Sequence, residues 1–145
     1  MMSTTVKQVF DLAVQLMGEA DESTGATETP ATAEYKNRTI PILNVLQYEC
    51  YALSDTYAAA SAGKRPVPPL LTDFTSGIGL DDGVCRSVLP YGLASHLLLE
   101  ENAKLASFFL DRYEEQKTRF GRIPGELSPI EDSYGGIEGG GFSAW

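Results

Sequence analysis

The chain has 145 residues, of which 43% are hydrophobic and 21% are charged, and its formal net charge is −9. A chain of this length can form one domain with a substantial core. No apolar run approaches the roughly 20 residues that a membrane-spanning helix needs, and no basic stretch followed by an apolar one marks a secretion signal. We therefore expect a protein of the reducing cytoplasm without a membrane partner. The acidic balance argues against nucleic acid as a direct ligand, because neutralising phosphates requires clustered Lys and Arg.

The negative charge is concentrated in two segments. Residues 19–34 contain five acidic residues and no basic one, and residues 121–145 contain four acidic residues and one basic one. These segments hold −5 and −3 of the net charge of −9, which leaves the rest of the chain nearly neutral. Two interpretations stay open: the acids solvate exposed loops, or they dock onto a basic partner surface.

The first predicted helix covers Val6–Met17. Thr5, followed three residues later by Gln8, is typical of a capping box at a helix start. Gly18 can end the helix in the left-handed conformation. An apolar stripe at helical spacing indicates the buried face: Val9, Leu12 or Ala13, and Leu16.

A long polar loop and a second helix follow. Residues 18–33 contain no large apolar side chain and are rich in helix breakers, so we expect a long exposed loop. The second helix should begin near Pro30 or Thr32 and continue to about Tyr57. Pro41 lies inside it, and we expect a kink or a break there because proline removes a backbone hydrogen bond. The buried stripe of this helix is predicted to be Tyr35, Ile42, Leu46, Cys50 and Leu53.

Residues 63–83 form a second irregular segment. Pro66, Pro68 and Pro69 exclude a helix in its first half. A short strand or hairpin between about residues 67 and 80 is compatible with the sequence. We therefore expect a loop that contains at most one hairpin.

A third helix should run from about Gly83 to Leu99. Asp81 or Asp82 can cap its start, and Pro90 should kink it. Two small side chains along this helix allow another helix to approach closely: Gly92 and Ala94.

A fourth helix is predicted from about Asn102 to Phe120. Its buried face is expected to be Ala106, Phe109, Leu110, Tyr113 and Phe120. The chain is thus predicted to be mainly α: a small antiparallel bundle of about four helices. Residues 1–120 would form the helical domain with its two irregular loops, and residues 121–145 an extended arm.

The last 25 residues, 121–145, are rich in Gly and Pro. Such a segment cannot bury enough apolar surface to fold on its own. It nevertheless carries the single Trp of the chain, and large aromatic side chains are frequent anchors of protein interfaces. We therefore predict an arm that docks onto a partner. Its candidate interface residues are Ile130, Tyr134, Phe142 and Trp145.

Few residues have the spacing that catalysis or metal binding requires. His96 is the only histidine, which is too little for a catalytic triad or a zinc site. Cys50 and Cys85 are far apart in sequence and are expected to be buried thiols. Asp81 and Asp82 are interpreted as helix caps, not as ligands of a divalent cation. We therefore predict no catalytic residue, no metal and no cofactor, since an enzyme would need groups that converge from scattered positions.

The segments from Leu80 to Asn102 and from Ala106 to Glu115 together form a distinctive pattern. It resembles the pattern of small helical structural proteins of tailed bacteriophages and prophages, including head-to-tail connector (adaptor) and related neck proteins. The residues that carry the resemblance are Asp81-Asp82 at a helix start, the run Pro90-Tyr-Gly-Leu-Ala94, Glu100-Glu101 at a break, and the spaced set Ala106, Phe109 and Tyr113.

This resemblance implies a non-enzymatic structural protein of the virion that is assembled in the host cytoplasm. Such connectors form homo-oligomeric rings, typically dodecamers, beneath the portal protein and extend arms onto neighbouring neck or tail proteins. DNA would then be only passing cargo in a channel, and an acidic wall lets DNA slide because it repels phosphates. The alternative hypothesis is a soluble cytoplasmic helical module for protein–protein interaction.

Overall fold

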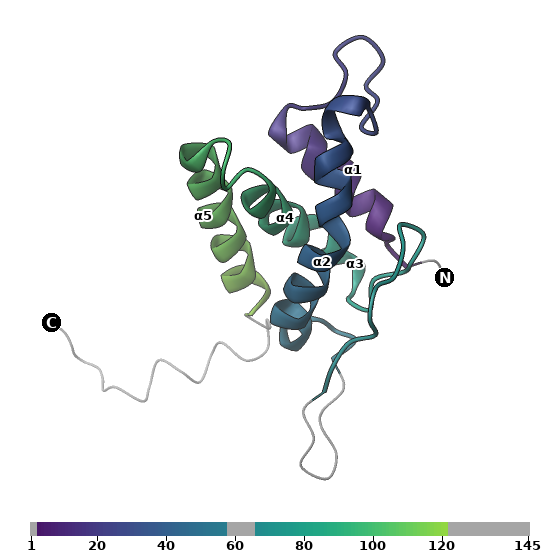
Figure 1. Cartoon of the computed structure of the whole chain (residues 1–145). Coiled ribbons are helices and arrows are strands. Elements are labelled where there is room, and N and C mark those ends of the chain that lie inside the picture. Colours follow the sequence, from purple (N-terminus) through teal and green to yellow (C-terminus); the bar gives the residue numbers. More distant parts are fainter. Residues whose placement is uncertain (1–2, 58–65, 122–145) are drawn as a thin grey trace, which may run out of the picture.

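A computed structural model of the chain describes residues 3–57 and 66–121 (Figure 1). This part of the chain is mainly helical, and it contains no β-strand beyond an isolated bridge between Thr5 and Gly77. The predicted small helical bundle is confirmed. Its α-helices are α1 (Val6–Met17), α2 (Ala33–Cys50), α3 (Asp82–Ser87), α4 (Leu89–Leu97) and α5 (Ala103–Phe120), with 3₁₀ turns at Pro30–Thr32 and Tyr51–Leu53.

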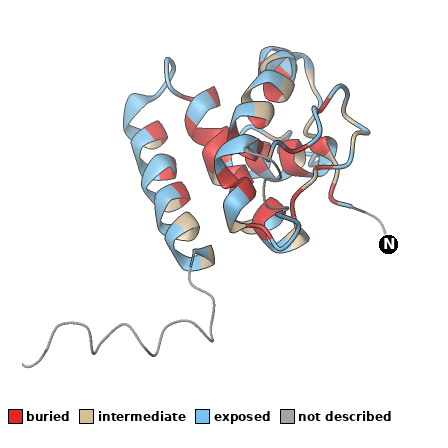
Figure 2. Cartoon of the chain, turned by 90° about the horizontal axis from the view of Figure 1, so that it is seen from below, coloured by how far each residue is buried: buried red, intermediate tan, exposed pale blue. Residues whose placement is uncertain are grey.

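Helix α4 lies at the centre of the bundle, between α1 and α5, and also contacts α2 and α3 (Figure 1). Seven of its nine residues are buried, whereas α5 buries only one stripe of side chains and exposes the rest (Figure 2). A short helix that is apolar on nearly every side needs neighbours all around it. Helix α4 is therefore the element on which the others assemble.

Helix α1 has the predicted bounds and the predicted ends. The Thr5 hydroxyl accepts a hydrogen bond from the Gln8 amide at 3.3 Å, and the Gln8 side chain accepts one from the Thr5 amide at 2.9 Å. Gly18 ends the helix at φ 76°, a conformation that favours glycine. The predicted stripe needs correction: Val9 and Ala13 are buried, but two members are exposed, namely Leu12 and Leu16.

Helix α2 differs from its prediction at two points. It runs through Pro41 without a break. Because Pro41 has no backbone N–H, the carbonyl of Asn37, four positions earlier, has no hydrogen-bond donor within the helix. Both residues are exposed, so water can satisfy that carbonyl. The helix also ends at Cys50 and not near Tyr57, because the chain leaves through a 3₁₀ turn and becomes extended at Ser54. In its buried stripe Leu43 lies in the core, while Ile42 and Leu53 are only partly buried.

The single helix predicted over residues 83–99 is two helices. The backbone of Val88, at φ −106° and ψ −52°, separates α3 from α4. Pro90 then lies in the first turn of α4, where a missing N–H breaks no intrahelical bond. Asp81 is the N-cap of α3 and accepts a hydrogen bond from the Val84 amide at 3.0 Å, whereas Asp82 accepts one from the Thr4 hydroxyl at 2.6 Å.

The hairpin considered for residues 67–80 does not form. Side chains of α2 replace a partner strand: Asn44 exchanges two hydrogen bonds with the Leu71 backbone, at 3.1 and 2.8 Å. Gln47 donates to the Pro69 carbonyl at 2.9 Å and accepts from the Gly79 amide at 2.8 Å. The backbone of residues 4–7 bonds the rest of the segment, at Phe74, Ser76 and Ile78. Because α2 and the N-terminal residues together satisfy its backbone, the segment forms no hairpin.

The close helix approach predicted at Gly92 is confirmed. A Cβ atom on Gly92 would lie 2.7 Å from Cε1 of Tyr113 in α5 and 3.0 Å from Cδ1 of Leu46 in α2. The Tyr113 hydroxyl donates to Glu49 at 2.7 Å and lies 3.4 Å from the sulfur of Cys50. We call this set the Gly92 seam: Leu46, Glu49, Cys50, Gly92 and Tyr113.

The buried face of α5 is narrower than predicted. Ala106, Phe109 and Tyr113 are buried, as expected. Phe120 is half-buried, and Leu110 is 45% exposed. Leu110 lies at the edge of the stripe, and its exposure leaves room for the groove described below.

Candidate assembly surfaces

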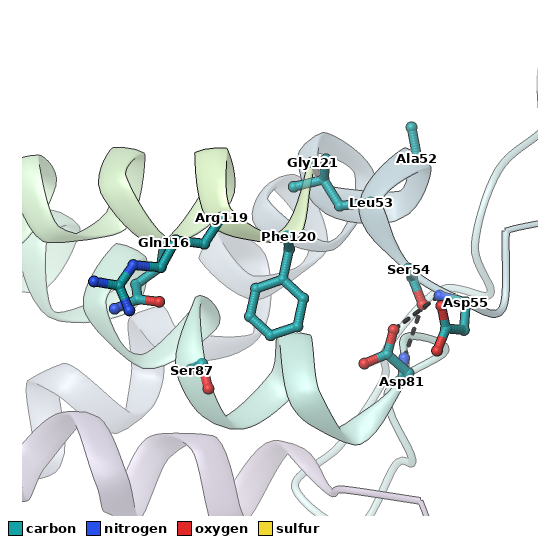
Figure 3. A pocket seen from close by; sticks show the side chains of 10 residues that line it. All are labelled: Ala52, Leu53, Ser54, Asp55, Asp81, Ser87, Gln116, Arg119, Phe120 and Gly121. Atoms are coloured by element: carbon teal, nitrogen blue, oxygen red, sulfur yellow. Dashed lines mark hydrogen bonds between the residues drawn. The ribbon is translucent and has the colours of Figure 1, made fainter. Parts of the chain in front are cut away.

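The first candidate surface is a groove where α5 ends, which we call the arm-root groove (Figure 3). It has a volume of about 620 Å³. Phe120 projects into its middle, with Gln116 and Arg119 on one side and Asp55 and Asp81 on the other. Gly121, the last residue of the described part, lies on its rim. Gly121 therefore joins this groove to residues 122–145, the segment predicted to be an arm.

A hydrogen-bond network holds the acidic side of the arm-root groove rigid. One carboxylate oxygen of Asp81 accepts from the Asp55 amide at 2.8 Å, and the other caps α3. The Asp81 amide donates to the Ser54 hydroxyl at 2.8 Å. Both Asp81 oxygens are thus engaged by backbone amides, which is the chemistry of a structural cap and not of a catalytic acid.

The second candidate surface is the α4–α5 groove, a hollow of about 260 Å³ beside the start of α5. Its floor is made of small side chains, among which Ser95 and Ala106 are buried. The Ser95 hydroxyl donates to the Gly92 carbonyl at 2.8 Å, so it does not need a ligand as a partner. The walls include Leu99, which is 61% exposed, and Leu110, which is 45% exposed. The groove is lined by Ser95, His96, Leu99, Ala103, Ala106, Ser107 and Leu110.

Further large apolar side chains are exposed on other sides of the bundle. Leu12 and Leu16, one turn apart on α1, are 40% and 42% exposed, and we call them the α1 patch. Phe108 is 54% exposed on α5, where its ring meets Phe109 edge-on at 5.4 Å. The Phe109 ring in turn lies 6.2 Å from the ring of the half-buried Tyr91, and we call Phe108 and Tyr91 the α5 patch. The two patches lie on helices that α4 separates (Figure 1).

The acidic loop, which begins after Gly18, is tied to the bundle by charge. Glu28 forms ion pairs with Lys36 of α2 at 2.8 Å and with Lys7 of α1 at 3.3 Å. Lys7 also pairs with Asp11 at 3.0 Å, and Asp11 accepts from the Thr27 hydroxyl at 2.6 Å. We call these residues the loop clamp. Hydrogen bonds from Lys36 and Lys7 hold the pKa of Glu28 below its usual value.

The predicted site residues have different outcomes. Ile130, Tyr134, Phe142 and Trp145 lie outside the described residues. His96 is exposed on the rim of the α4–α5 groove. Cys50 and Cys85 are buried free thiols, as expected, and burial raises the pKa of Cys85 to about 12, which makes this thiol a poor nucleophile.

The described residues form neither a metal-binding cluster nor a membrane-spanning helix. Over residues 3–57 and 66–121, no three His, Cys, Asp or Glu side chains gather as a metal ion would require. Within the same ranges, no helix combines the length and the apolar character needed to cross a membrane.

The α4–α5 groove was not expected from the sequence. Its floor combines small residues of two helices, and only their packing brings Ser95 next to Ala106. The one available signal was the small residues of the α5 N-terminal half, Ala103, Ala106 and Ser107, which leave little bulk at the positions beside the buried stripe.

The chain matches no protein-family model, no curated protein and no solved structure. Its function is therefore inferred from its own surfaces and from the pattern of its own residues.

Proposed function

We propose that this chain is a non-enzymatic structural protein of a tailed bacteriophage, a head-to-tail connector or adaptor that forms a ring at the capsid portal. The resemblance of residues 80–115 to such proteins supports this proposal. Those residues build α3, α4 and most of α5, and the Pro90-Tyr-Gly-Leu-Ala94 run lies in the central helix that contains Gly92. The residues of this run are thus mostly buried in the bundle core.

The observation that carries the proposal is a pair of apolar patches on two helices that α4 separates. A closed ring is built from heterologous contacts, in which one surface of each subunit meets a different surface of the next. The α1 patch and the α5 patch provide two such surfaces, because they lie on helices that α4 separates. Exposed aromatic and aliphatic anchors of this kind are the usual energetic centres of interfaces.

Charge is also compatible with a ring around DNA. Residues 19–34, with five acidic residues and no basic one, would repel phosphates at the wall of a channel and not bind them. DNA would therefore be cargo, while the portal protein and other neck or tail proteins would be partners. The location would be the virion.

Two charge-introducing substitutions test the ring geometry: Leu16→Asp in the α1 patch and Phe108→Asp in the α5 patch. Each variant has lost one surface and should remain monomeric at concentrations where the unaltered protein forms larger species. An equimolar mixture should form dimers and nothing larger, because each variant still has the surface that the other needs. Size-exclusion chromatography with light scattering measures these masses.

Glu22→Gln alters an exposed residue of the acidic loop and should assemble like the unaltered protein. A simple dimer that resists both patch substitutions would contradict the ring and would favour the alternative, a cytoplasmic interaction module. Mass spectrometry of purified phage particles tests location, since a connector must be present in the virion at ring-like copy number.

A further inference from the structure

We propose that the α4–α5 groove is the receptor for the distal part of the arm, residues 135–145, and that it takes an aromatic side chain of that segment, Phe142 or Trp145. The inference rests on the proposed assembly role of the arm but identifies where the arm binds. It differs from the ring contact, which uses the α1 and α5 patches.

The groove favours an aromatic side chain over a polar ligand or a whole helix. Its volume of about 260 Å³ suits one large side chain and its neighbours. The two buried residues of its floor need no polar partner from a ligand, since the Ser95 hydroxyl donates a hydrogen bond to the Gly92 carbonyl and Ala106 is apolar. Apolar pockets with few polar groups select occupants by burial of apolar surface, and exposed Leu99 and Leu110 would become covered.

The arm has the composition and the reach to supply that side chain. Residues 135–145 contain five glycines and three large apolar residues, namely Ile137, Phe142 and Trp145. Glycine lets the backbone approach a surface closely. From Gly121 back to Leu110, α5 covers roughly 16 Å at its helical rise. The chain from Gly121 to Phe142 can extend up to about 70 Å, which reaches the groove of its own copy or of an adjacent one.

The charges near the groove offer an acidic arm one ion-pair partner. Residues 122–145 carry four acidic residues and one basic residue. Lys104, next to the groove residue Ala103, forms no ion pair anywhere in residues 3–57 and 66–121. Glu100 and Glu101 are also near and keep their charge, although Glu101 accepts a hydrogen bond from the Tyr35 hydroxyl at 2.6 Å. Glu138, four residues before Phe142, can thus lie near Lys104.

Trp145 is the only tryptophan of the chain, so its fluorescence reports the arm in the full-length protein. The test variant is Ser107→Phe, which fills the groove from its edge. The matched control is Thr118→Phe, at an exposed position of the same helix that does not line the groove. In the unaltered protein we expect Trp145 emission at short wavelength and protection from acrylamide. Ser107→Phe should shift the emission to that of the denatured chain and raise quenching severalfold, whereas Thr118→Phe should change neither.

A second measurement does not depend on filling the groove. Ser107→Cys combined with Ser143→Cys should form a disulfide under mild oxidation several times faster than Thr118→Cys combined with Ser143→Cys. A non-reducing gel shows whether the bond joins one chain or two, and either product supports the groove as the receptor. Equal rates for the two pairs, with Trp145 emission indifferent to Ser107→Phe, would overturn the inference.

The two proposals fail separately. If the mixed patch variants form dimers but Trp145 emission does not change in Ser107→Phe, the ring proposal is supported and the assignment of the groove as receptor is wrong. If Trp145 is protected by the groove but the patch variants show no complementation, the arm has its receptor and the ring proposal is wrong.

Discussion

The Gly92 seam and the loop clamp hold this chain together by opposite means. At the seam, Tyr113 packs directly on the backbone of Gly92, and Cys50 and Leu46 are buried beside it. At the clamp, Glu28, Lys7 and Asp11 bridge elements across a surface that water reaches. The seam depends on close packing and on the exclusion of water, whereas the clamp depends on charge. A change in side-chain size should therefore disturb the seam, and a change in charge or salt concentration should disturb the clamp.

The difference also explains what each region contributes. Burial of well-packed apolar surface is the dominant favourable term in folding, and the seam joins the central helix to α2 and α5. Exposed ion pairs contribute little to global stability, but the clamp fixes a polar loop that has no large apolar side chain to anchor it. The seam therefore holds the fold, and the clamp sets the position of one acidic segment.

The largest effect is expected from Gly92→Ala. The added methyl group would meet Tyr113 at 2.7 Å, and Tyr113 cannot retreat without losing its hydrogen bond to Glu49. Overpacking of this kind costs about 1–3 kcal/mol, which should exceed the gain of about 1 kcal/mol from the better helix propensity of alanine. Urea unfolding followed by circular dichroism measures the difference.

Gly121→Ala is the control for that substitution. Gly121 has φ −72°, a value open to any residue, and its added methyl group would lie no closer than 3.4 Å to a neighbouring atom. Its free energy of unfolding should stay within about 0.5 kcal/mol of that of the unaltered protein. Equal effects of the two substitutions would show that the approach at Gly92 is not tight.

Alkaline pH should weaken the seam and the core around it. Burial raises the pKa of the Cys50 and Tyr113 side chains, and it raises that of Cys85 to about 12. A thiol ionises near pH 8.5 when the chain is unfolded. The stabilising contribution of Cys85 is thus complete below that pH and is lost as the pH rises towards about 12.

Thermal unfolding between pH 7 and 10 measures this loss. Cys85→Ala, although less stable at neutral pH because of the cavity it creates, should lose less stability over the same interval. A variant that loses as much as the unaltered protein would show that this thiol does not contribute to the alkaline sensitivity.

The smallest effect is expected from Glu28→Gln at the clamp. This change removes the ion pairs with Lys7 and Lys36 but retains a hydrogen-bonding side chain. Global stability should hardly change, whereas amide exchange in residues 21–28 should become faster at low salt. At high salt the two proteins should converge, because ions screen exposed pairs.

The stabilisation that the Glu28 carboxylate gives to the loop should also be lost in acid. The folded-state pKa of Glu28 is lowered, so its stabilisation is present above the pKa of an unfolded glutamate and is lost as the pH falls through the lowered value. Glu22→Gln removes the same charge from the loop without touching the clamp and should leave amide exchange unchanged. Faster exchange in that control would mean that total loop charge, and not the clamp, sets the loop position.

Local features of the chain were predicted well because their causes are local. The capping box of Thr5 and Gln8 and the terminal Gly18 define α1 within the span of a few residues. The spacing of Ala106, Phe109 and Tyr113 likewise defines the buried stripe of α5. The small size of Gly92 even indicated where helices would meet. These signals depend on the residues themselves and their neighbours in sequence.

Predictions failed where a distant partner decided the outcome. A hairpin at residues 67–80 was considered because nothing in that segment indicates that Asn44 and Gln47 of α2 would satisfy its backbone. Pro41 stays inside α2 because that position faces water, which only the packed bundle determines. Leu12 and Leu16 have the character of core residues but are exposed, because no element within residues 3–57 and 66–121 covers that side of α1.

The sequence by itself determined the helical class, the ends of α1 and the unequal distribution of charge, because periodicity, caps and composition act over short distances. It also pointed to an arm with aromatic anchors. Only the tertiary structure decided which apolar side chains stay exposed, where Val88 divides a helix, and that small residues of α4 and α5 enclose a groove. Those features depend on which surfaces meet, and a contact between distant residues has no signature in either segment alone.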